Sequence, residues 1–296
     1  MAEELNGPGS DDDSLATTDE AVSPSREPLE EQDRERPPVA AFFDLDKTVL
    51  AKSSSLVFAK PFYQGGLIGR GDVVKSAYAQ FVFLSSGADH DQMEQMRAYL
   101  SALSTGWDVE KVKRIVAETM DSLVDPIVYD EALQLIAEHK EAGHDVIVIS
   151  SSGNEVVEPI GVRLGVDLAI GTQMAVEDGH YTGEVLFYAY GPGKAEAISS
   201  LAEERGYDLQ RCFAYSDSAT DLPMMDAVGH PVATNPDEEL REIAQQRRWP
   251  ILEFAKPVAM RSPLETREGR AKAAAAVGGA VALGLAWYAG RRSAGR

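Results

Sequence analysis

Two aspartates separated by a single residue, Asp44 and Asp46, directly follow a short apolar run at residues 39–43. A carboxylate pair at this spacing could provide a nucleophile with a neighbouring general acid/base, or two ligands for a metal ion. The same stretch, which continues to Thr48, could instead form a turn whose Asp and Thr side chains cap a helix. Taken alone, the pair leaves chemistry and capping equally open.

A second polar group, Ser150, Ser151, Ser152 and Gly153, follows the apolar run at residues 146–149. Hydroxyl groups and backbone amides at the start of a helix form a site for an anion. Serine and glycine are also common in ordinary loops, so this group is weak evidence by itself.

The third candidate is Lys194, which begins a predicted helix after Gly191, Pro192 and Gly193. A lysine there lies at the positive end of the helix dipole, which is mildly unfavourable. A negative charge nearby would explain its presence, although a solvated surface lysine is the ordinary alternative.

The fourth candidate is Asp217 and Asp221, which lie behind an apolar run at residues 212–215. Their carboxylates are hard oxygen ligands of the kind that suits Mg²⁺, although either residue could cap a helix. The four groups together, in this order and each beside a predicted strand end, are much less ambiguous than any one of them. We therefore predict a single site.

Apolar runs bounded by turn residues alternate with helical periodicity through most of the chain. We expect strands at 39–43, 145–149, 167–170, 212–215, 231–233 and 251–254, and helices at 154–164, 194–204, 221–228 and 236–246. A hairpin with Glu177-Asp178-Gly179 as its turn should follow the third strand. This alternation predicts an α/β fold with a doubly wound parallel sheet and right-handed crossovers. Because open parallel sheets place their sites at the carboxyl ends of the strands, the four groups should meet there.

The stretch from residue 54 to 142 differs, because its apolar residues recur at helical spacing and it is too long for one crossover. We therefore predict a helical cap at 54–142, inserted into a core formed by 39–53 and 143–256. The two ends have compositions of their own. We expect a disordered acidic arm at 1–38, a linker at 257–272, an apolar segment at 273–290 and a basic end at 291–296.

The chain is acidic: its 296 residues include 28 Lys and Arg against 48 Asp and Glu, for a formal net charge of −20. Because phosphate backbones need a positive surface, we expect no nucleic-acid partner. Cys212 is the only cysteine, which excludes an internal disulfide and favours a reducing, cytoplasmic location. The oligomeric state cannot be predicted from these features.

The apolar segment at 273–290 carries no charge, and as a helix it would extend about 27 Å, close to the thickness of a bilayer core. Basic residues flank it, and Trp287 and Tyr288 near one end suit the membrane interface. Eight alanines and four glycines make it only weakly apolar, so a helix on a surface or against a partner is the alternative. Residues 273–296 are therefore a candidate membrane contact.

Together the motifs resemble the haloacid dehalogenase superfamily of phosphohydrolases, over about residues 39–254. The first motif is matched by Asp44-Leu-Asp46-Lys-Thr48, the second by Ser150, the third by Lys194 and the fourth by Asp217 and Asp221. The helical insertion is similar to the C1 cap of the phosphoserine-phosphatase-like branch, subfamily IB. Residues 214–225 and 228–237 resemble an actinobacterial group within that branch. The resemblance implies a Rossmann-like core and phosphatase activity.

The resemblance also implies roles for individual residues. Asp44 would be the nucleophile that forms an aspartyl-phosphate, and Asp46 would be the general acid/base. Ser150 and Ser151 would bind the phosphate, while Lys194 would offset charge on both the nucleophile and the phosphate.

A Mg²⁺ ion is implied as the cofactor, because a carboxylate that attacks a phosphate otherwise faces strong repulsion. Its ligands would be the side chains of Asp44 and Asp217 and the backbone carbonyl of Asp46. Asp221 would be a further ligand or a partner of one. Thr48 completes the catalytic motif.

Two departures from the branch concern the substrate. Phosphoserine phosphatases usually carry a glutamate five residues beyond the first-motif threonine, where it helps to bind the substrate's amino group, whereas this chain has Ser53. Their fourth motif usually has Gly, Gly and Asn where this chain has Ser216, Ser218 and Thr220. We therefore expect hydrolysis of a small phosphorylated metabolite without predicting which one.

Three other functions stay open on the sequence. The aspartyl-phosphate could be transferred to an acceptor other than water, or the substrate could be a lipid-like phosphate, as the apolar segment suggests. A membrane-tethered regulatory or scaffold protein with a slow or vestigial site is the third. Such a protein would be expected to lose Asp44, Asp46 or Lys194, and this chain retains all three.

Overall fold

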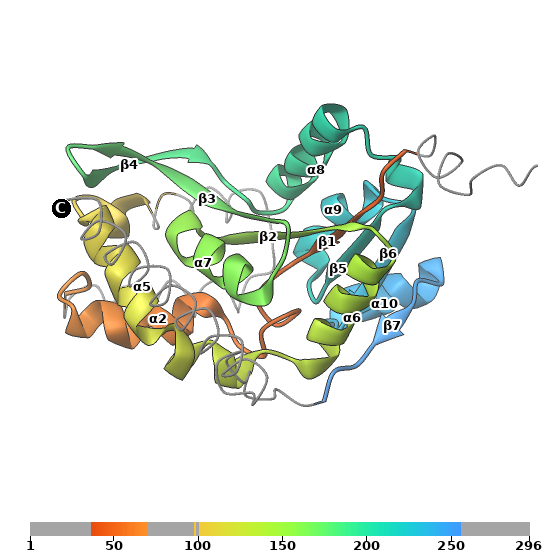
Figure 1. The fold of residues 1–296 in the computed structure, drawn as a ribbon, viewed down its shortest axis with the longest axis horizontal. Coiled ribbons are helices and arrows are strands. Elements are labelled where there is room, and N and C mark those ends of the chain that lie inside the picture. The colour runs from red at the N-terminus through yellow and green to blue at the C-terminus, as the bar shows by residue number, and fades with distance from the viewer. Residues whose placement is uncertain (1–36, 70–97, 99–100, 256–296) are drawn as a thin grey trace, which may run out of the picture. The chain divides into compact units, whose positions relative to one another are not determined.

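The computed structural model describes residues 37–69, 98 and 101–255 (Figure 1). They form a seven-stranded sheet in the order β4-β3-β2-β1-β5-β6-β7. The strands are β1 (Ala40–Phe43), β2 (Asp145–Gly153), β3 (Leu168–Glu177), β4 (His180–Phe187), β5 (Phe213–Ser216), β6 (His230–Thr234) and β7 (Ile251–Leu252). Every neighbouring pair is parallel except β3 with β4. The predicted α/β class with a mostly parallel sheet is therefore confirmed.

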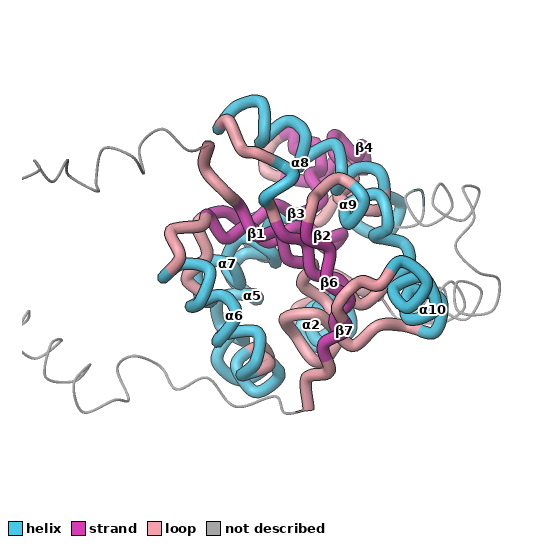
Figure 2. The backbone as a smooth tube through the Cα atoms, turned by 90° about the vertical axis from the view of Figure 1, so that its right-hand side faces the viewer, coloured by secondary structure: helices cyan, strands magenta, loops and turns pink. Residues whose placement is uncertain are grey.

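Helices cover both faces of the sheet (Figure 2). The core on one face includes residues of α2 (Ser54–Gln64), α5 (Val109–Leu123), α6 (Asp130–Glu141) and α7 (Asn154–Leu164), and the core on the other includes residues of α8 (Pro192–Arg205), α9 (Leu222–Asp226) and α10 (Glu238–Arg247). In β1, Ala41 and Phe43 join the first core while Ala40 and Phe42 join the second. Since successive strand residues point to opposite faces, a strand covered on both sides is apolar throughout.

The antiparallel edge of the sheet is the predicted hairpin. Its turn residues Asp178 and Gly179 have φ values of 50° and 79°, the left-handed pair that a tight two-residue hairpin requires. β3 continues to Glu177, beyond the predicted end at residue 170, because its outer half pairs with β4.

Other predicted boundaries also differ from the structure. The largest difference is in β2, which continues to Gly153 and not to residue 149, so that Ser150, Ser151 and Ser152 lie within the strand. α10 begins at Glu238 and not at residue 236, because the Asp237 side chain caps it by accepting from the Leu240 amide at 2.7 Å. The helix predicted at 221–228 is a short 3₁₀ turn, Ala219–Asp221, followed by α9. β7 ends at Leu252, and the Phe254 amide donates to the Asn235 side chain.

α6 lies inside the predicted cap range yet packs on the sheet. Its Ile136 belongs to the same core as Val146 and Val148 of β2, and its His139 Nε2 lies 2.8 Å from the Tyr215 hydroxyl of β5. The division of the chain into a core and a cap stays a prediction, and α6 is the element on which its second boundary depends.

The predicted end segments fall almost wholly outside the described residues. This holds for the acidic arm apart from Pro37 and Pro38, for the linker, for the apolar segment at 273–290 and for the basic end. Within the part of the chain that the structure describes, no helix is long and apolar enough to cross a membrane.

Candidate active site

The carboxyl ends of the three central strands bring three of the predicted motifs together. β1 lies between β2 and β5, with Phe43 in register with Val148 on one side and Tyr215 on the other. Asp44 follows β1 at once, and its amide donates to the Tyr215 carbonyl at 2.9 Å. Asp44, the second-motif serines and Asp217 therefore leave the sheet at one edge.

The loop after β1 turns sharply at Lys47, whose φ of 63° is left-handed. Its closing hydrogen bonds run from the amides of Val49 and Leu50 to the Leu45 carbonyl, at 3.0 and 2.9 Å. The turn buries Thr48, whose hydroxyl donates to Asp217 Oδ1 at 3.5 Å, and leaves the Lys47 side chain 66% exposed.

Lys194 meets the negative charge that its place in the sequence suggested. Its Nζ lies 2.5 Å from Asp44 Oδ1 and 2.8 Å from Asp221 Oδ2, and its side chain is only 3% exposed. The approach of α8 requires Gly193, because a Cβ there would lie 2.0 Å from the Tyr188 carbonyl oxygen. The backbone thus places a buried lysine between two buried carboxylates from different loops.

Asp221 Oδ2 also accepts a hydrogen bond from the Ser216 hydroxyl at 2.6 Å. This oxygen is therefore engaged by Lys194 and Ser216 together, which favours a role for Asp221 as a partner of the lysine. The side-chain contacts of Asp217 are longer. Lys47 Nζ lies 3.8 Å from its Oδ2, and the Thr48 hydroxyl donates to its Oδ1 at 3.5 Å.

The second-motif serines lie at the end of β2. Ser150 is buried, and its hydroxyl accepts from the Ser152 amide at 3.3 Å. The Ser151 carbonyl accepts from the Thr172 hydroxyl at 2.7 Å, and this bond holds the backbone of the second motif against β3. Ser152, which belongs to the second predicted group but was given no role of its own, is buried, and its hydroxyl lies 2.7 Å from the Ser54 hydroxyl.

Asp46 is held by the first residues of α2. Its Oδ1 accepts from the Ser54 amide at 2.9 Å, and its Oδ2 accepts from the hydroxyls of Ser54 and Ser53 at 3.1 and 3.2 Å. Ser53 was notable in the sequence only for replacing a glutamate, and nothing in the sequence singled out Ser54.

Asp237 is a further residue that sequence reasoning missed. Its amide donates to the Asp217 carbonyl at 2.7 Å and its Oδ2 accepts from the Ala219 amide at 3.1 Å. Asp237, at the start of α10, therefore holds the fourth-motif loop in place through two hydrogen bonds. Its only signal in the sequence was its place at the end of the stretch 228–237.

The charges of this cluster are strongly coupled. Burial alone would lower the pKa of Lys194, but the carboxylates of Asp221 and Asp44 outweigh it and raise that pKa, so the lysine stays charged. Burial raises the pKa of Asp44, Lys194 opposes the shift, and Asp221 and Asp217 add to it. Burial likewise raises the pKa of Asp217 to about 7, against the opposing effect of Lys47.

These shifts bear on whether the site could hold a cation. Three buried carboxylates face one buried lysine, so ionising all of them leaves negative charge that the cluster does not neutralise. Among the described residues, no three His, Cys, Asp or Glu side chains are arranged to hold a metal by themselves. The donor set fits Mg²⁺ only with backbone oxygen included, as in the predicted set of Asp44, Asp217 and the Asp46 carbonyl.

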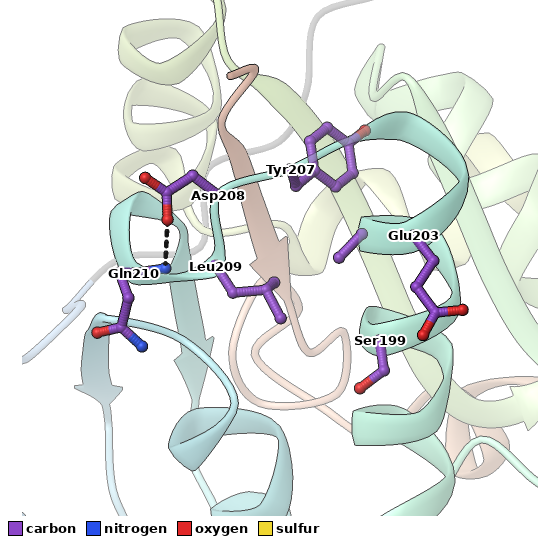
Figure 3. A pocket seen from close by; sticks show the side chains of 7 residues that line it. Ser199, Glu203, Tyr207, Asp208, Leu209 and Gln210 are labelled. Carbon is purple, nitrogen blue, oxygen red and sulfur yellow. Dashed lines mark hydrogen bonds between the residues drawn. The ribbon is translucent and has the colours of Figure 1, made fainter. Parts of the chain in front are cut away.

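A hollow of about 480 Å³ lies elsewhere, between α8 and the turn that follows it (Figure 3). It is lined by Ser199, Ala202, Glu203, Tyr207, Asp208, Leu209 and Gln210. The Asp208 amide donates to the Pro38 carbonyl, which precedes β1, so this hollow lies toward the amino end of that strand. None of the predicted site residues lines it.

The comparison with known families agrees with the geometry. Residues 41–226 match the family described as haloacid dehalogenase-like hydrolase, which is more than half of the chain. The chain belongs to this family. This haloacid dehalogenase-like hydrolase is therefore an enzyme, and the predicted resemblance is confirmed.

Its relatives include actinobacterial proteins. It is 60% identical over 264 residues to the inhibition of morphological differentiation protein of Streptomyces azureus, which covers 87% of this chain and 95% of the relative. It is 54% identical over 252 residues to a probable phosphatase of Mycobacterium tuberculosis, covering 84% and 88%. A phosphoserine phosphatase of the same species is 35% identical over 225 residues, covering 74% and 73%.

A solved structure shares the fold of this haloacid dehalogenase-like hydrolase. A protein of unknown function from Bordetella pertussis matches with a TM-score of 0.65 and 26% identity, covering 73% of this chain and 99% of that one.

Proposed function

We propose that this haloacid dehalogenase-like hydrolase is a phosphatase that removes the phosphoryl group from a small phosphorylated metabolite, with Asp44 as the nucleophile. The relatives named phosphatase and phosphoserine phosphatase support the reaction class. The observation that carries the proposal is the buried Lys194, which is held between Asp44 and Asp221. Phosphoryl transfer depends mainly on positioning and charge neutralisation, and this arrangement supplies both.

In the first step, an Asp44 oxygen attacks phosphorus while the bond from phosphorus to the leaving oxygen breaks. Asp46 gives its proton to that leaving oxygen, so the alcohol departs neutral and an aspartyl-phosphate stays on the enzyme. In the second step, Asp46 takes a proton from water as the water attacks phosphorus. The bond from phosphorus to the Asp44 oxygen breaks, so inorganic phosphate leaves and Asp44 returns to its carboxylate form.

The other residues bind and orient the phosphoryl group. The Ser150 hydroxyl and the Ser151 backbone would donate to its oxygens from the end of β2, and Lys194 would neutralise charge that builds up on them. Asp221 and Ser216 keep the lysine in position. Asp44, Asp217 and the Asp46 carbonyl would hold Mg²⁺, which would supply Lewis-acid neutralisation of the negative charge.

Residue 53 limits the choice of substrate more than the names of the relatives do. The glutamate that helps phosphoserine phosphatases bind an amino group has no equivalent at Ser53. The test is a panel of phosphate esters with Mg²⁺, comparing kcat/KM for phosphoserine, sugar phosphates and glycerol phosphates. The proposal expects phosphate release from at least one class, and absence of release from all of them, and from p-nitrophenyl phosphate, would contradict it.

No observation favours the other functions. The comparisons lend no support to a regulatory protein with a retired site, and the residues that such a protein would lose are retained and clustered. A phosphotransferase and a lipid-like substrate depend on acceptors or segments outside the described residues.

Binding of Mg²⁺ is expected to depend on pH. Burial raises the pKa of Asp217 to about 7, so below that pH Mg²⁺ must displace a proton from this carboxyl. Mg²⁺ should therefore raise the melting temperature more at about pH 8 than at about pH 6. Thermal unfolding with Mg²⁺ and with EDTA at both pH values measures this difference.

Asp217→Asn is the control for that measurement, because the amide has no proton to lose in this range. The variant should show a smaller Mg²⁺ effect that changes less with pH, because Asp44 is then the one carboxylate ligand left to lose a proton. An equal Mg²⁺ effect on the wild type at both pH values would count against Asp217 as a ligand.

A further inference from the structure

The carboxylate of Asp46 receives three hydrogen bonds from two consecutive serines. Ser54 donates its amide to Oδ1 at 2.9 Å and its hydroxyl to Oδ2 at 3.1 Å, and Ser53 donates its hydroxyl to Oδ2 at 3.2 Å. These contacts come from a different element than Asp46 itself, which lies in the loop after β1. The orientation of the carboxylate is therefore set by the start of α2.

The start of α2 is built around this contact. Ser53 is the N-cap residue, yet its side chain makes no capping hydrogen bond to the helix. The hydroxyl that would ordinarily cap α2 goes to Asp46 instead. The Ser54 amide is one of the first-turn donors that a helix leaves unpaired, and Asp46 accepts it.

The same contact continues toward the phosphate-binding motif. The Ser54 hydroxyl has one proton, which it gives to Asp46, so the Ser152 hydroxyl 2.7 Å away must donate to Ser54. The Ser152 amide in turn donates to the Ser150 hydroxyl at 3.3 Å. Ser54 and Ser152 thus connect Asp46 to the motif that would bind the phosphoryl group.

We infer that Ser53 and Ser54 are positioning residues that hold the Asp46 carboxyl for proton transfer, so that residue 53 serves the acid/base and not the substrate. This inference rests on the proposed function. Proton transfer requires the carboxyl oxygen within hydrogen-bond reach of the leaving oxygen, and a freely rotating carboxyl satisfies this only part of the time.

The hydrogen bonds also distinguish the two oxygens of Asp46. Oδ2 accepts two of the three hydrogen bonds and Oδ1 accepts one. Since each carboxylate oxygen has about two acceptor positions, Oδ1 retains one for the transferred proton. In the first step the Oδ1–H bond breaks, the leaving oxygen gains the proton, and its bond to phosphorus breaks with the electron pair.

The test compares two substrates of similar shape whose leaving groups differ in their need for a proton. p-Nitrophenolate is a stable anion and leaves phosphorus without protonation, whereas phenolate is more basic and depends on it more. Loss of acid positioning should therefore lower kcat/KM, which covers the steps up to departure of the leaving group, far more for phenyl phosphate than for p-nitrophenyl phosphate. Ser53→Ala, Ser54→Ala and the double variant are assayed on both substrates.

We expect kcat/KM of the double variant to fall about tenfold or more for phenyl phosphate, which is within the range that general acid catalysis contributes. For p-nitrophenyl phosphate, kcat/KM should fall much less. Ser53→Thr retains a hydroxyl and should behave as the wild type. Ser55→Ala is the matched control, because Ser55 neighbours the pair but, within the described part of the chain, its hydroxyl approaches only Ser152, at 3.4 Å. Ser53→Ala removes no capping bond, so its fold should be preserved even if Ser54→Ala melts earlier.

Equal losses of kcat/KM on the two substrates would overturn the positioning role while leaving the proposed function intact. The same selective loss in Ser55→Ala would also overturn it. A wild-type protein that hydrolyses neither ester with Mg²⁺ would contradict the proposed function itself, and the positioning role would fall with it.

Discussion

Asp44→Asn is expected to lower the hydrolysis of p-nitrophenyl phosphate by at least about a thousandfold, because the amide cannot form the acyl phosphate on which both steps depend. The substitution is nearly isosteric, so the loop after β1 should keep its shape. Phosphate release with Mg²⁺, measured at saturating substrate, gives the ratio of kcat values directly.

Stability should respond differently from activity in this variant. Burial raises the pKa of Asp44, which means that its ionised form is costly in the fold despite Lys194. A neutral amide removes that cost, and Lys194 keeps its contact with Asp221. We therefore expect Asp44→Asn to melt at or near the wild-type temperature, which separates loss of chemistry from loss of fold.

Asp145→Asn is the matched control for Asp44→Asn. Asp145 begins β2, where it is in register with Ala40 at the amino end of β1, and its side chain contacts Arg205 and Tyr207. The same change at that opposite end should leave kcat unaltered. Substantial activity in Asp44→Asn would remove Asp44 as the nucleophile and, with it, the proposed mechanism.

The sheet and its helices could be predicted from the sequence because their apolar patterns are imposed by burial. The run at 39–43 is apolar at every position since Ala41 and Phe43 face one core while Ala40 and Phe42 face the other. The helix at 154–164 was predicted at its observed bounds, because Asn154 follows a strand and Gly165 ends the helix with a φ of 71°.

The meeting of Asp44 with Lys194 could be anticipated only from topology. The two residues are 150 positions apart, and parallel strand order is what carries both to one edge of the sheet. Which Asp221 oxygen the lysine would contact, and that Ser216 would share it, depends on side-chain packing that no spacing encodes.

The contact of Ser53 with Asp46 also could not be predicted from the sequence, because it depends on the conformation of the loop between them. Residue 53 reaches Asp46 because Lys47 adopts a left-handed φ of 63°, which folds the loop back so that α2 starts beside it. Lysine has no preference for that conformation, so the turn left no signal. The resemblance therefore showed that a glutamate was missing but not that Ser53 would contact Asp46.

Replacing Lys194 with Met is expected to reduce both activity and stability. The side chain is buried, and its removal leaves Asp44 and Asp221 facing each other without the cation that both contact. Breaking a buried ion pair in this way costs about 3–5 kcal/mol. Loss of charge neutralisation at the phosphoryl group should lower kcat by about a hundredfold to a thousandfold.

The pH dependence of the loss of stability in Lys194→Met identifies the cause of that loss. Without the lysine, which opposes the effect of burial, the pKa of Asp44 in the folded protein should rise further above its unfolded value. The folded state then binds more protons than the unfolded state, so the stability of the variant should fall as pH rises and recover in acid. Melting temperatures of Lys194→Met and the wild type at about pH 5.5 and about pH 8, both in EDTA, test the sign of that difference.

Lys47→Met is the control that separates a buried cation from an exposed one. Lys47 also faces the cluster, but its side chain is 66% exposed and its Nζ is 3.8 Å from Asp217 Oδ2. Exposed pairs of this kind contribute little to stability, so its melting temperature should stay close to that of the wild type. If Lys194→Met instead melted like Lys47→Met at both pH values, the buried carboxylates would not depend on the lysine, and the charge balance argued for this site would be wrong.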